Sequence, residues 1–77
     1  MVSPLQEWLK TRGMSQAELA VIASSDAPTV SRIARGQHKP FGKVRRVLAQ
    51  HCPEVLEAQD RYVDVYRKHL TSRLKAA

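Results

Sequence analysis

The 77-residue sequence predicts a small all-α domain, with four short helices followed by a longer C-terminal helix. Three observations support this prediction. Helix start signals recur at short intervals, apolar residues return every three or four positions, and almost no segment alternates apolar and polar residues as a strand does. Apolar residues make up 43% of the chain and charged residues 26%, a composition that folds rather than stays disordered.

The first two predicted helices each begin at a serine that forms a capping box with a side chain three residues later. Ser3 is followed by Pro4, which is favoured in a first turn, and then by its partner Gln6. This helix ends near Gly13, and its apolar side carries Leu5, Leu9 and, at the edge of the core, Trp8. Ser15 and Glu18 begin the second helix, whose predicted inward stripe is Leu19, Ala20, Ile22 and Ala23.

A turn of three residues, Ser24-Ser25-Asp26, separates the second helix from the third. Asp26 is a strong N-cap residue, and Pro28 fits a first turn because it has no N–H to lose. The third helix ends at Gly36 and faces inward with Val30, Ile33 and Ala34. After a loop over residues 37–40, a fourth helix is predicted from about Phe41 to Gln50, with Val44, Val47, Leu48 and the aromatic ring of Phe41 buried.

Pro53 begins a final helix that is predicted to continue to about Lys75. Its apolar residues approach a heptad spacing that Gln59 interrupts, which favours an amphipathic helix packed on the domain and on a second subunit. A chain this small also buries too little surface for high stability, so a homodimer is expected. Residues 1–52 and 53–77 are thus taken as the functional part and the dimerisation element of one domain. The predicted dimerisation residues are Leu56, Tyr62, Val63, Tyr66, Leu70 and Leu74.

Positive charge is concentrated in the middle of the chain, which has a formal net charge of +6. No acidic residue occurs between Ala27 and Pro53, and the basic residues of that stretch are Arg32, Arg35, Lys39, Lys43, Arg45 and Arg46. A concentrated basic segment in a small folded domain indicates a polyanionic partner. A solvated basic face without a partner is the alternative that charge alone leaves open.

Residues 15–36, SQAELAVIASSDAPTVSRIARG, resemble the helix-turn-helix of the lambda-repressor and Cro family. Members of that family often carry S-Q-x-E-L-A, a turn, and then P-T-[IV]-S-R-I-x-R-G, and the resemblance extends over about residues 5–52. The matching residues are Gln16, Glu18, Leu19, Ala20, Pro28, Thr29, Val30, Ser31, Arg32, Ile33, Arg35 and Gly36. One departure lies in the turn, where the family usually has a glycine and an apolar residue and this chain has Ser24 and Ser25.

The resemblance implies a four-helix bundle whose third helix enters the major groove of double-stranded DNA. Arg32 is the best candidate for reading a base, because a guanidinium binds guanine O6 and N7 with two hydrogen bonds. Gln16 has the position of the family's backbone-contacting glutamine, at a helix N-terminus that favours a phosphate. The full set of expected DNA contacts is Gln16, Ala27, Pro28, Thr29, Ser31, Arg32, Arg35, Lys39 and Lys43.

These features predict a sequence-specific transcriptional regulator, a repressor of bacterial or phage origin that binds a pseudo-palindromic operator as a homodimer. Two alternatives stay open: the antitoxin of a toxin–antitoxin pair, with the last helix holding a toxin, and a protein-interaction adaptor with an acidic partner. No enzyme, cofactor or metal site is expected, because the histidines and Cys52 lack catalytic or ligating spacing. The lone cysteine and the lack of a signal or membrane-spanning segment favour the cytoplasm.

Overall fold

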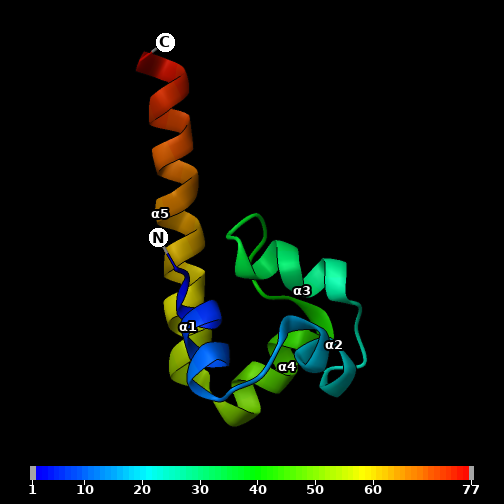
Figure 1. Cartoon of the computed structure of the whole chain (residues 1–77). Helices are drawn as coiled ribbons and strands as arrows, with labels where there is room; N and C mark the ends of the chain where they lie inside the picture. The colour runs from blue at the N-terminus through cyan, green and yellow to red at the C-terminus, as the bar shows by residue number, and fades with distance from the viewer. Residues whose placement is uncertain (1, 77) are drawn as a thin grey trace.

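The computed structural model describes residues 2–76, which form five helices and no strand (Figure 1). The prediction of an all-α chain with four short helices and a longer last one is confirmed. No helix in this range combines the length and apolar character that crossing a membrane requires. The helices are α1 (Pro4–Thr11), α2 (Gln16–Ile22), α3 (Ala27–Ala34), α4 (Gly42–His51) and α5 (Pro53–Ala76).

The helix start signals of the sequence are confirmed at the first three helices. The Ser3 hydroxyl accepts the N–H of Gln6 at 3.2 Å, and the Gln6 side chain accepts the N–H of Ser3 at 3.0 Å. Ser15 and Glu18 form the same reciprocal pair at 3.1 and 3.0 Å. The Asp26 carboxylate accepts the N–H of Thr29 at 2.9 Å and caps α3. These local bonds fix where each helix begins because they use N–H groups that the helix itself leaves free.

The core lies where α1, α2, α3, α4 and the first part of α5 meet. Leu5, Val30 and Leu48 are fully buried in it, and Trp8 packs at its edge as predicted. The prediction for Ile22 is wrong, because its side chain is 53% exposed. Leu19, Ala20 and Ala23 occupy the inward side of the α2 segment, and Ile22 lies about 100° around the helix from the middle of that set.

The start of α4 also differs from the prediction. The helix begins at Gly42, and Phe41 precedes it as an N-cap residue whose side chain makes no capping bond. The expected burial of Phe41 is wrong, because the ring is 54% exposed. Pro40 is fully buried instead, so the loop between α3 and α4 is anchored by the proline and leaves the neighbouring aromatic ring outside.

Gln59 ties α5 to the first and third helices. Its side chain is fully buried, accepts the N–H of Leu5 at 2.9 Å and donates to the carbonyl oxygen of Ile33 at 2.8 Å. The Leu5 N–H belongs to the first turn of α1 and has no partner within the helix. The residue that interrupts the heptad pattern is therefore a buried polar link between three helices.

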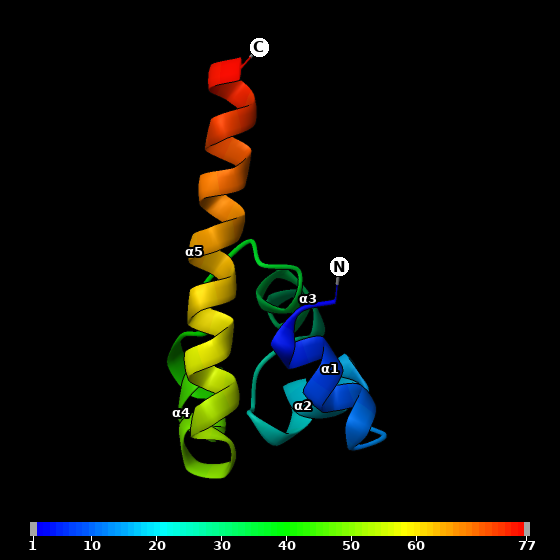
Figure 2. The ribbon, with the colours of Figure 1, turned by 90° about the vertical axis from the view of Figure 1, so that its left-hand side faces the viewer.

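The N-terminal part of α5 packs against α1 and α4, whereas its C-terminal part extends beyond the other helices. Figure 2 shows the same extension from a perpendicular direction. α5 comes close to the end of α3, where a Cβ atom added to Gly36 would lie 2.8 Å from Cε1 of Tyr62 and 3.5 Å from Cδ1 of Tyr66. Gly36 has a φ of +85°, so the position requires glycine both for its conformation and for this approach.

Candidate functional site

The turn between α2 and α3 places a serine in the left-handed conformation. Ser24 has a φ of +53°. Its N–H donates to the carbonyl of Val21 at 3.1 Å, and the N–H of Ser25 donates to the carbonyl of Ala20 at 2.8 Å. This is the Schellman arrangement that usually carries glycine at the left-handed position. The chain therefore makes a tight turn without the glycine, at the cost that a Cβ atom adds to a positive φ.

The two sides of α3 differ completely in exposure. Val30 and Ile33 are fully buried against the core, whereas Pro28, Arg32 and Arg35 are exposed on the opposite side, which we call the outer face of α3. Ala27 is exposed at the start of the helix, and Thr29 and Ser31 are half-buried on the flanks. Gln16, at the start of α2, is also half-buried.

Asp26 is the one acidic residue at the start of α3. Hydrogen bonds from Thr29, first from its side chain and then from its backbone N–H, lower the pKa of the Asp26 carboxyl, and the nearby charge of Arg32 lowers it further. The carboxylate is thus held ionised as a cap. Its charge is directed to the helix N-terminus, where a negative group is favoured.

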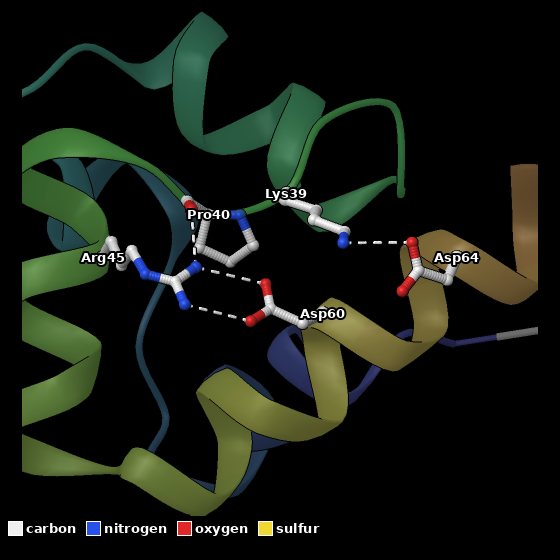
Figure 3. Close-up of polar contacts among 5 residues, drawn as sticks. All are labelled: Lys39, Pro40, Arg45, Asp60 and Asp64. Carbon is white, nitrogen blue, oxygen red and sulfur yellow. Dashed lines mark hydrogen bonds and ion pairs between the residues drawn. The ribbon is translucent and has the colours of Figure 1, made fainter.

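Two of the basic residues in the acid-free stretch are paired with carboxylates of α5 (Figure 3). The Arg45 guanidinium makes two bonds to Asp60, at 3.3 and 3.2 Å, and a third to the carbonyl oxygen of Pro40 at 3.1 Å. The Lys39 ammonium lies 3.1 Å from the Asp64 carboxylate. These contacts fasten the loop after α3 to the last helix. Lys39, an expected DNA contact, is directed to α5 in this structure rather than left free beside α3.

Three other basic side chains are arranged around the outer face of α3. Arg32 lies on the face itself and lines a small hollow with Thr29, His38 and Phe41. Lys43, at the start of α4, reaches to 3.5 Å from the carbonyl oxygen of Ser24 and so lies beside the α2–α3 turn.

Arg35, at the opposite end of α3, lines a second hollow. The other residues of that hollow come from the start of α1 and from α5 and are Gln6, Tyr62, Tyr66 and His69. Arg32, Lys43 and Arg35 therefore surround one face, whereas Lys39 does not join them.

Sequence reasoning gave no firm role to His38 and placed Phe41 in the core, although both border the hollow beside Arg32. Their rings meet edge to face, with centroids 6.4 Å apart and an interplanar angle of 78°. The only available signal was their position, directly after the third helix and within the acid-free stretch. An exposed aromatic ring beside a guanidinium adds an apolar surface to the edge of the outer face.

Within residues 2–76, no group of three or more histidine, cysteine, aspartate or glutamate side chains is placed to hold a metal ion. Cys52 is buried at the end of α4. Burial raises the pKa of its thiol, and the charge of Arg12 opposes that rise. A buried thiol with a raised pKa is a poor nucleophile, so Cys52 is a packing residue.

The residues predicted to contact a second subunit separate into two groups. Val63 is fully buried and Leu56 is 9% exposed, so both pack inside the chain itself and are not available to another copy in this conformation. Tyr62 and Tyr66 are half-buried and stacked, with ring centroids 6.2 Å apart. Leu70 and Leu74 are 40% and 80% exposed on the extended end of α5.

Comparisons with models of protein families, with curated proteins and with solved structures found no match to this chain.

Proposed function

We propose that this protein is a sequence-specific DNA-binding regulator of the lambda-repressor-like kind, with α2 and α3 as its helix-turn-helix. The observation that carries the proposal is the outer face of α3. It is exposed, has Arg32 near its centre, and belongs to a stretch from Ala27 to Pro53 without an acidic residue. An exposed helix face with a central arginine and small neighbours suits the major groove, which admits one α-helix.

Arg32 reads a base in this mechanism, and the residues around it position the helix. A bidentate contact from Arg32 to guanine contributes about 1–3 kcal/mol of discrimination. Ala27 and Pro28 offer only apolar contact, for example to a thymine methyl group. Thr29 and Ser31 provide hydroxyl groups on the two flanks of the face.

Phosphate contacts fix the register of the helix in the groove without specifying sequence. Gln16 at the start of α2, Lys43 beside the α2–α3 turn and Arg35 at the end of α3 supply these contacts in the proposal. The pairing of Lys39 with Asp64, at 3.1 Å, gives Lys39 a smaller part. An ion pair between partly exposed side chains is weak, so a phosphate can compete for the ammonium group.

A homodimer places two such helices in successive major grooves, about 34 Å apart, on a pseudo-palindromic operator. Leu70 and Leu74, together with the half-buried Tyr62 and Tyr66, are the proposed contacts to the second subunit. Occupancy of the operator would exclude polymerase or a competing regulator, and repression is the expected outcome.

Selection from randomised duplex DNA at near-physiological salt tests this function. The protein is expected to enrich a palindrome whose half-sites are one helical turn apart. Arg32→Ala is expected to lose preference at one base pair, whereas Lys43→Ala weakens binding to all sequences to a similar extent. If folded protein enriches no motif, the DNA-binding proposal fails, and an adaptor with an acidic protein partner becomes the better explanation.

A further inference from the structure

The end of α5 is the most exposed regular element of the chain. We call residues 67–75 the overhang, since they extend beyond the other helices in both views (Figures 1 and 2). Every side chain from Arg67 to Lys75 is exposed. At 1.5 Å per residue, the overhang is about 14 Å long. The overhang continues a helix that the packed part of α5 has already nucleated, and its exposed side chains are open to a partner.

The charge of the overhang limits what that partner is. It contains Arg67, Lys68, Arg73 and Lys75, and no acidic residue follows Asp64. The ion pairs within residues 2–76 join Lys39 to Asp64 and Arg45 to Asp60, so the four cations of the overhang have no acidic partner there. The helix dipole favours cations only in the last turn and does not account for Arg67 and Lys68. These cations favour an anionic partner for the overhang in addition to the second subunit proposed for Leu70 and Leu74.

The overhang rises from the same corner as the outer face of α3. Arg35, on that face, shares a hollow with Tyr62, Tyr66 and His69 of α5. The spacing of positions 62, 66, 69 and 73 is four, three and four residues, which puts Arg73 on the same side of α5 as the residues of the hollow. Arg35 lines this hollow, and Arg73 follows His69 by one turn on the same side of α5, where it lines a separate hollow with Leu70 and Leu74.

We infer that the overhang contacts the phosphate backbone of the duplex whose major groove is read by α3, with Arg73 as the contacting cation. This inference rests on the proposed DNA-binding function. The N-terminal residues of a recognition helix contact the base edges, and its C-terminal end can reach the backbone that borders the groove. The C-terminal end of α3, where Tyr62 packs against Gly36, would therefore lie beside a phosphate strand. The overhang stands beside that end of α3.

The test compares two substitutions that remove the same charge from opposite sides of the overhang. Arg73→Gln removes the cation on the side of the hollow, and Lys68→Gln removes one about 140° around the helix from it. Both side chains are exposed, and equal melting temperatures would show that neither change affects folding. Binding of the selected operator duplex is measured for both variants and the wild type at several salt concentrations.

Arg73→Gln removes one phosphate contact from each subunit of the dimer, so it is expected to make the slope of log K against log salt less steep by about 1.8 and to lower affinity about thirtyfold at 0.15 M salt. Lys68→Gln is expected to leave the slope nearly unchanged, and both variants keep the preferred sequence. If the two variants change the salt slope equally, or if Arg73→Gln does not change it, the proposed phosphate contact is wrong. Loss of base preference in Arg32→Ala would show in the same assay that α3 still reads the DNA. Failure of the wild type to bind any duplex would instead overturn the DNA-binding function and this inference together.

Discussion

Replacing Gln59 with leucine tests whether this residue stabilises the fold through its buried hydrogen bonds or only interrupts the apolar stripe of α5. Leucine would leave the N–H of Leu5 buried without its partner at 2.9 Å, which costs about 1–3 kcal/mol. It would also remove the 2.8 Å bond to the carbonyl of Ile33, worth about 0.5–1.5 kcal/mol, although that oxygen keeps the N–H of Gly36 at 3.1 Å. Gln59→Leu is therefore expected to destabilise the protein by about 2–4 kcal/mol.

Urea unfolding followed by circular dichroism measures this difference, and thermal unfolding is expected to show a melting temperature lower by about 10–25 °C. Gln50→Leu is the matched control, because it makes the same change at an exposed position of α4 and should shift stability by less than about 0.5 kcal/mol. If Gln59→Leu equals or exceeds the wild type in stability, the apolar stripe is the correct description and the buried link contributes nothing.

Three further predictions concern helix ends. Gly13→Ala is expected to lower the free energy of unfolding, measured in urea, by about 1–2 kcal/mol because of its positive φ alone. Gly36→Ala is expected to lower it clearly more, because its Cβ would lie 2.8 Å from Tyr62. Equal losses of stability in the two variants would contradict the packing of Tyr62 on Gly36. Ser24→Gly is expected to stabilise the protein by about 0.5–1 kcal/mol, and a loss of stability would refute the strain at its φ of +53°. Since the folded-state pKa of Asp26 is lowered, its contribution is present above about pH 4 and lost as the pH falls through the lowered pKa. Asp26→Asn keeps a capping side chain that does not titrate, so its melting temperature should fall less than that of the wild type between pH 6 and pH 3. If the melting temperatures of both proteins fall in parallel over this range, the ionised Asp26 carboxylate does not stabilise α3.

The features that sequence predicted correctly are those determined within a few residues. The capping boxes at Ser3 and Ser15 and the cap at Asp26 each join groups three residues apart, so the pattern contains both partners. The inward side of α3 follows from helical periodicity in the same way, because Val30 and Ile33 fall on one side of any helix that begins at Asp26. The fold class and the candidate outer face of α3 could therefore be predicted before any tertiary contact was known.

The features that sequence reasoning missed depend on where α5 lies. Gln59 bonds to groups 54 and 26 positions away in the chain, and no local pattern indicates that an amide will meet a free N–H and a carbonyl there. The pairing of Arg45 with Asp60 is similar, and it converts a basic residue of the acid-free stretch into part of the scaffold. Phe41 was expected inside because of its place at a helix start, but the buried Pro40 already anchors that loop.

Long-range contacts with α5 help to determine the orientation of α3. Its first turn is held by the local cap at Asp26, whereas its last turn is held by α5, through the bond from Gln59 to the carbonyl of Ile33 and through Tyr62 against Gly36. The two ends of the proposed recognition helix thus depend on different parts of the chain. A change at the buried link should tilt α3 without touching its outer face. In a variant that is still folded at the assay temperature, such a change would weaken DNA binding and leave the preferred base at the Arg32 contact the same, a pattern opposite to that of Arg32→Ala.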